Sequence, residues 1–179
     1  MDVMSTTFLP VLVSLEELDA EDEEDIVLDE FVGDLAVGYA AGPAYHGLLT
    51  WADLRGLRMT VETLRGYAFD LLAKWAPDAQ VVGQPPALML SFGGWESCVV
   101  LADDFWERLS AQVPGELVIG VPARDVVVIT GSGSRPGVER VRRAVDRLFY
   151  AGGRNLLSRD LLVWRRGWEV WRHYPPHPH

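Results

Sequence analysis

The stretch from Leu117 to Thr130 constrains the fold most, because it holds two apolar strands joined by a tight turn. The first strand, LVIGV, ends at Val121, and the second, VVVIT, begins at Val126 after Pro-Ala-Arg-Asp. Proline suits an early turn position, and Asp readily bonds to the backbone of a turn. Both strands are apolar on both faces, so we expect this hairpin to lie in the centre of a sheet.

Shorter patterns predict further antiparallel strands. Residues 8–13 predict an edge strand, because Pro10 cannot donate a ladder hydrogen bond. The remaining predicted hairpins pair residues 34–40 with 45–49, residues 87–92 with 95–101 across Gly93-Gly94, and residues 161–164 with 168–171.

Two long helices are predicted by apolar residues at helical spacing. The first begins at Thr60 and the second at Pro136, which suits a first helical position. Thr50 and the pair Asp103-Asp104 mark the starts of two short helices. The expected fold class is α+β: a mainly antiparallel sheet of several hairpins, with two long helices and one or two short ones packed on it. We expect residues 1–172 to form a single domain and residues 173–179 to form a disordered tail.

The composition limits the classes of function. The chain has 179 residues and a net charge of −10, which disfavours unspecific nucleic-acid binding because phosphates repel an acidic protein. The single cysteine, Cys98, cannot form an internal disulfide, which favours a reducing compartment. The N-terminus lacks a signal-peptide pattern, and no apolar run approaches the about 20 residues of a membrane helix. We therefore expect a cytoplasmic protein with no membrane partner.

Opposite charges gather toward the two ends of the chain. Residues 1–30 hold 11 carboxylates and no Lys or Arg, whereas residues 135–179 hold ten Arg and four carboxylates. The acidic segment at residues 16–25 predicts a solvated, mobile loop that a basic protein could bind. Arg140, Arg143 and Arg147 fall opposite the apolar stripe of the second long helix, where they are candidate binding residues.

The segment GSGS at residues 131–134 lies between a strand and a helix, as in a phosphate-binding loop. The Lys of a P-loop is missing, and the third glycine of a dinucleotide fingerprint falls one place late, at Gly137. The preceding strand also belongs to a predicted antiparallel hairpin and not to a parallel βαβ unit. We interpret the segment as a connector and expect no cofactor, leaving open a weak anion site beside Arg135.

No metal site or catalytic group emerges from residue spacing. Cys98 lies in an apolar run that is typical of a core position. The histidines of the tail, His173, His177 and His179, have no rigid geometry. No serine lies in a GxSxG turn. The tryptophans near the C-terminus predict core packing, with an exposed stacking surface beside the Arg residues as the alternative.

Several motifs, in order, resemble the YtpQ-like family of bacterial proteins, a domain of unknown function. The resemblance spans about residues 8–171 and depends on the turn with Pro122, Arg124 and Asp125 and on four further segments: residues 33–39, 49–54, 97–106 and 155–169. The chain departs from the family at Asp70-Leu71, where relatives often carry Asn-Leu, and at Leu156, where Pro is usual. The resemblance implies no reaction. Two roles remain open for the Arg-Asp turn: its side chains could hold neighbouring loops in place, or they could line a binding surface.

The sequence therefore favours a non-catalytic protein-binding module, similar to an immunity, adaptor or chaperone protein. Its partner is expected to be a protein, with a basic partner favoured by the acidic segment, and a homo-oligomer is left open. The alternative is an enzyme whose site surrounds Arg124 and Asp125. A pocket with convergent polar groups would favour the enzyme, whereas a flat charged or apolar surface would favour the binding module.

Overall fold

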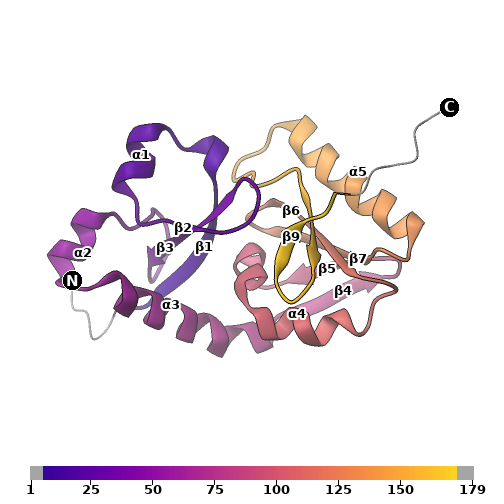
Figure 1. Ribbon diagram of the computed structural model, residues 1–179, viewed down its shortest axis with the longest axis horizontal. Helices are drawn as coiled ribbons and strands as arrows, with labels where there is room; N and C mark the ends of the chain where they lie inside the picture. Colours follow the sequence, from indigo (N-terminus) through magenta and orange to yellow (C-terminus); the bar gives the residue numbers. More distant parts are fainter. Residues whose placement is uncertain (1–5, 173–179) are drawn as a thin grey trace.

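Residues 6–172 are described by a computed structural model, in which two antiparallel sheets and several helices form an α+β fold. The sheets have three and six strands and lie beside each other along the longest axis of the molecule (Figure 1). Every named strand pairing is antiparallel. The expected fold class is confirmed, with the strands divided between two sheets.

The smaller sheet has a buried strand at one edge. In spatial order its strands are β1 (Phe8–Ser14), β3 (Leu35–Ala41) and β2 (Asp29–Glu30). All seven residues of β1 are buried, although β1 pairs with no named strand except β3. The edge position predicted from Pro10 is confirmed.

Two helices that accompany this sheet begin directly after the threonines that were predicted to mark their starts. α2 (Trp51–Leu57) begins after Thr50, whose side chain forms a capping box with Asp53. α3 (Val61–Trp75) begins after Thr60 and buries Leu64, Ala68 and Leu72. It packs on β1 and extends toward the larger sheet (Figure 1). A 3-10 turn, η2 (Ala76–Asp78), follows at Pro77.

The larger sheet is centred on the hairpin predicted from the sequence. Its strands in spatial order are β4 (Gln80–Gln84), β5 (Ala87–Ser91), β7 (Val126–Gly131), β6 (Leu117–Ala123), β8 (Leu161–Trp164) and β9 (Trp168–Val170). The β6–β7 and β8–β9 hairpins are confirmed.

The two faces of the larger sheet bury different residues, because side chains alternate along each strand. Val118 and Val128 face Val141 and Val145 of α5 (Arg135–Ala151). The opposite face joins the main core together with Trp106 of α4 (Asp103–Ser110). Helices therefore cover both faces of this sheet.

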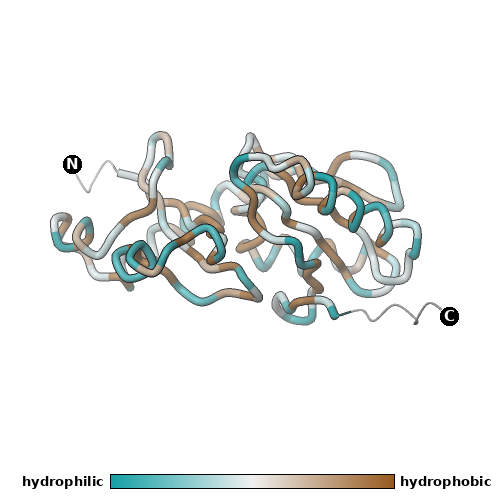
Figure 2. The backbone as a smooth tube through the Cα atoms, turned by 90° about the horizontal axis from the view of Figure 1, so that it is seen from above, coloured by the Kyte–Doolittle hydropathy of each residue, from teal (hydrophilic) through white to brown (hydrophobic). Residues whose placement is uncertain are grey.

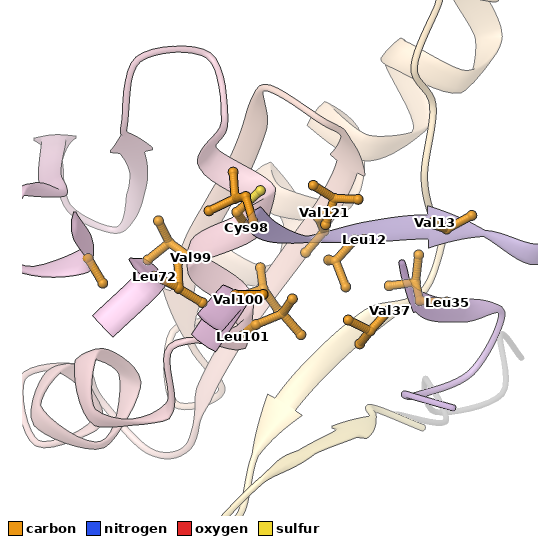
Figure 3. Close-up of a cluster of buried hydrophobic side chains, with 14 of the residues drawn as sticks. Leu12, Val13, Leu35, Val37, Leu72, Cys98, Val99, Val100, Leu101 and Val121 are labelled. Carbon is orange, nitrogen blue, oxygen red and sulfur yellow. The ribbon is translucent and has the colours of Figure 1, made fainter. Parts of the chain in front are cut away.

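The main core is continuous between the two sheets. The segment η3 (Glu96–Leu101), a 3-10 helix with every residue buried, lies at the junction. Figure 3 shows Val99, Val100 and Leu101 of η3 between Leu12 of β1 and Leu72 of α3. The apolar run around Cys98 thus joins the two halves of the molecule.

Two predicted hairpins are wrong. Residues 95–101 form no strand, because residues 96–101 form η3, and β5 pairs with β4 and β7. Gly93 and Gly94 still form a turn, with φ of 60° and 92°. Residues 45–49 form no strand: β2 takes the second edge of β3, and the segment keeps one hydrogen bond to β3, from Leu49 N–H to the Tyr39 carbonyl.

The acidic segment at residues 16–25 is not the predicted loop. It contains a 3-10 turn, η1 (Leu15–Glu17), and a short helix, α1 (Ala20–Asp25). The Asp19 side chain accepts a hydrogen bond from Asp22 N–H and so caps α1. No residue of α1 is buried, so the predicted solvation is found, and the predicted mobility stays a prediction. The predicted tail, residues 173–179, lies outside the described residues.

Candidate binding groove

One edge of β1 carries backbone groups that no strand uses. Leu15 N–H donates to the Asp34 carbonyl (2.9 Å) in register with the β1–β3 ladder. Because bonded and non-bonded pairs alternate in an antiparallel ladder, the odd-numbered residues of β1 bond to β3 and the even-numbered residues face away from it. Among the described residues no hydrogen bond is donated by the backbone N–H of Leu12 or Ser14, whereas the Ser14 carbonyl accepts the first hydrogen bond of η1 as its N-cap. β1 therefore presents an open strand edge.

Pro10 belongs to the same even-numbered set of β1 residues. Proline has no N–H, so the missing donor falls on the open edge and leaves the ladder to β3 intact. The donors of the open edge that lie beyond Pro10 are the N–H groups of Leu12 and Ser14.

The open edge lines a groove of about 590 Å³ between the two sheets. Its walls are residues 11–14 of β1, the loop 45–48 and the segment 153–157. With a rise of about 3.3 Å per residue, about 4.8 Å between neighbouring strands and about 10 Å between packed sheets, one strand residue fills about 160 Å³. The groove therefore has room for about four residues of an extended chain.

The wall opposite β1 is held by hydrogen bonds at its middle and directly after its last residue. Arg124 N–H donates to the Asn155 carbonyl (3.0 Å), which fixes the segment to the β6–β7 turn. Ser158 Oγ donates to Asp34 Oδ1 (2.7 Å), which fixes it to the smaller sheet. The segment therefore connects the two sheets, and both walls of the groove are anchored.

An aromatic cluster closes one end of the groove. The Tyr45 hydroxyl lies 2.6 Å from Thr7 Oγ1, just before β1. The Tyr45 ring meets Trp95 edge to face, with centroids 6.2 Å apart. Trp95 also lines a neighbouring hollow with Leu9, so its ring separates the two spaces. The closed end thus lies toward the start of β1.

Arg124 lies on this aromatic wall. Its guanidinium carbon is 4.6 Å from the centre of the Trp95 ring, a cation–π contact. Its Nε is buried and has no hydrogen-bond partner, and no ion pair of the described residues includes Arg124. An unpaired buried N–H is unusual in a folded protein and leaves this side chain available to an acceptor.

Asp125 is exposed and does not line the groove. One of the two roles that the sequence allowed for the Arg-Asp turn was structural, with the Arg124 and Asp125 side chains holding neighbouring loops in place. The loops are instead held by the backbone of Arg124, whose carbonyl also accepts a hydrogen bond from Ser97 N–H (2.9 Å). The structure thus brings Arg124 to the groove without Asp125.

Two buried side chains of η3, Glu96 and Cys98, lie near Arg124. Glu96 Oε1 accepts from Gly94 N–H (3.2 Å), while Oε2 has no partner. Burial raises the pKa of the Cys98 thiol to about 12, although the positive charge of Arg124 opposes this rise. Cys98 is therefore a neutral core thiol, as its apolar surroundings predicted.

The other end of the groove is acidic. Glu17 and Leu18 line it directly after β1, and α1 follows in the chain with five carboxylates among its six residues. No ion pair of the described residues includes a residue of the acidic segment. The groove thus has Arg124 at its closed end and a carboxylate-rich flank at its opposite end.

The candidate residues Arg140, Arg143 and Arg147 lie exposed on α5. Arg143 and Arg147 line a separate hollow of about 450 Å³ with Asp146, Tyr150 and Arg159. Arg143 pairs weakly with Glu139, at 3.9 Å. Figure 2 shows hydrophilic stretches along both α1 and α5, yet no ion pair of the described residues joins the two helices.

One partly buried polar cluster was not predicted from the sequence. Asp29 forms an ion pair with the Arg65 guanidinium and accepts a 2.5 Å hydrogen bond from the Tyr39 hydroxyl. The Arg65 hydrogen bond lowers the pKa of Asp29, and burial raises the pKa of Tyr39. Tyr39 and Arg65 lie 10 and 36 positions after Asp29 in the sequence, so no local spacing could indicate the cluster.

The glycine-rich segment 131–134 uses its N–H groups within the protein. Ser132 N–H donates to Glu116, and Gly133 N–H donates to Pro114, both through carbonyl oxygens. A Cβ on Gly131 would lie 2.0 Å from the Pro114 carbonyl oxygen, so close packing against residues 114–116 requires glycine here. This geometry supports the interpretation of a packed connector.

The chain matches no family model, no curated protein and no solved structure. The resemblance to the YtpQ-like family therefore remains a prediction.

Residues 6–172 contain neither a candidate membrane-spanning helix nor a candidate metal site. None of the helices there combines the length and apolar content needed to cross a membrane. Within the same range, no three His, Cys, Asp or Glu side chains are grouped so that they could hold a metal ion.

Proposed function

We propose that this chain is a non-catalytic, adaptor-like protein-binding module of the cytoplasm. It binds an extended segment of a partner protein along the open edge of β1. The observation that supports this function is the pair of unused N–H groups of Leu12 and Ser14, in a groove with room for one short extended segment. Added strands gain main-chain hydrogen bonds, while side pockets give specificity.

The charges at the groove favour a partner with basic residues on one side of the bound segment. Glu17 lies in the groove, and the exposed carboxylates of α1 follow it. Such charges mainly raise the association rate and select among partners. This arrangement agrees with the basic protein partner expected from the sequence.

A substitution at Ser14 tests the open edge. Ser14→Pro removes one N–H that faces the groove, whereas Ser14→Ala keeps it, and neither alters the ladder to β3. The probe is a random heptapeptide library presented with a free carboxyl terminus, from which peptides that bind the parent protein are selected. We expect Ser14→Pro to weaken a selected peptide about fivefold or more, the effect of one lost hydrogen bond.

Thermal unfolding of both variants provides the control for folding. The proposal is wrong if no peptide is selected above background, or if a selected peptide binds Ser14→Pro and Ser14→Ala equally well.

A further inference from the structure

Resting on this proposed function, the geometry points to a more specific ligand: the groove binds the carboxyl terminus of its partner, with Arg124 as the carboxylate receptor. Arg124 combines a lining position in the groove with a buried Nε that lacks a partner. Its planar guanidinium can bind both oxygens of a carboxylate.

The closed end of the groove favours a chain end over a continuing chain. Trp95 separates the groove from the next hollow, and Tyr45 packs against Trp95 while reaching Thr7. A strand that enters at the acidic end therefore stops at the aromatic wall after about four residues, the length that the groove volume allows.

The charges of the groove define a direction for the bound strand. A terminal carboxylate at Arg124 places the carboxyl end of the ligand near the start of β1, so the ligand runs antiparallel to β1. Its preceding residues then lie near Glu17, where basic side chains are favourable. Arg154, which also lines the groove and directly precedes Asn155 on the opposite wall, adds a second positive charge near the carboxylate.

Chemical variants of a selected peptide test the inference on the unmodified protein. We expect the free acid to bind at least about tenfold tighter than the C-terminal amide, as a charged hydrogen bond would give. An amidated peptide ending in Asp distinguishes a chain terminus from a side-chain carboxylate and is expected to bind as weakly as the plain amide. Equal affinity of acid and amide, or full recovery with the Asp amide, would overturn the inference.

Substitution of the receptor provides the second test. Arg124→Gln is expected to reduce the affinity for the acid to that for the amide and to leave the affinity for the amide unchanged. Asp125→Asn is the matched control, because its exposed side chain lies outside the groove, and it should leave both affinities unchanged. If Arg124→Gln does not fold, Arg124→Lys retains the positive charge and should show a reduced but measurable preference for the acid.

The two proposals fail in different ways. If acid and amide bind equally but remain sensitive to Ser14→Pro, strand binding stands and carboxylate recognition is wrong. If neither peptide is sensitive to Ser14→Pro, the proposed binding mode itself is wrong.

Discussion

At the scale of single residues, the cluster of Asp29, Arg65 and Tyr39 ties β2 and β3 to α3. Asp29 accepts hydrogen bonds from both partners, and its side chain is 25% exposed, against 41% for Arg65. This partial burial makes the ion pair stronger than a typical surface pair, while solvent still screens it. The cluster fixes the strand next to β3 on the side opposite the groove.

Arg65→Gln is expected to lower the free energy of unfolding by about 1–2 kcal/mol at neutral pH, a discounted value for a charged hydrogen bond. The folded-state pKa of Asp29 lies below its ordinary value of 3.8, so this stabilisation is full above that pH and is lost as the pH falls through the folded pKa. Urea unfolding from pH 7 to pH 3 should show the difference between parent and variant shrinking only below about pH 4. Arg140→Gln, an exposed change on α5, should show no such difference, and a pH-independent deficit in Arg65→Gln would contradict this account.

At the scale of elements, α1 is a helix that few interactions stabilise. It has six residues, none of them buried, and its carboxylates continue to its last residue, Asp25. Isolated helices this short are marginal in water, and negative charge at a helix C-terminus is unfavourable. The cap from Asp19 is therefore its main local support.

We expect the backbone amides of residues 16–25 to exchange rapidly with deuterium in the free protein at physiological salt. Combined replacement of Arg140, Arg143 and Arg147 by Gln should leave their exchange rates unchanged, because no ion pair of the described residues joins α1 to α5. Slow exchange in the parent would show that the acidic segment is ordered by tertiary contacts, and its availability to a basic partner would then lose support.

Helix starts and hairpins were predicted correctly where neighbouring residues in the sequence determine them. Thr50 and Thr60 cap the helices whose starts they were predicted to mark, and the hairpin around Pro122 lies at the centre of its sheet. The run at residues 96–101 was predicted wrongly because an apolar stretch buried on all sides has the same pattern in a strand and in a helix. The long-range pairing of β5 with β7 occupies the strand edge that residues 96–101 were predicted to use, so these residues form a helix instead of a strand.

The groove could be predicted only in part. Pro10 indicated an edge strand, and the turn at residues 122–125 drew attention to Arg124. The wall at residues 153–157 approaches β1 through contacts between segments more than a hundred positions apart, such as Ser158 with Asp34. No spacing in one sequence encodes that contact.

At the scale of the whole molecule, an inserted strand would join the two sheets along the groove. The bound segment would pair with β1 and lie against the anchored segment 153–157, so strand addition would link the smaller sheet to the larger one. Because alternate N–H groups of β1 face the groove, binding of a strand should change the hydrogen exchange of alternate residues.

Amide exchange along β1 should therefore alternate in the free protein. The N–H groups of Val11 and Val13 bond to β3 and should exchange slowly with or without peptide, whereas those of Leu12 and Ser14 should exchange faster and slow markedly when a selected peptide is bound. Hydrogen exchange followed by NMR resolves the four amides. Equal protection of all four in the free protein would contradict the open edge.

Pro10 also limits what the open edge can do between copies of the same protein. An unpaired strand normally serves as a template for edge-to-edge aggregation. Here the run of even-numbered donors is interrupted at Pro10, and the remaining edge lies inside a groove with room for about four residues of one chain. A second copy of β1, seven residues long and already part of a sheet, cannot enter this space. The protein can keep a strand edge permanently available to a partner without growing into fibres.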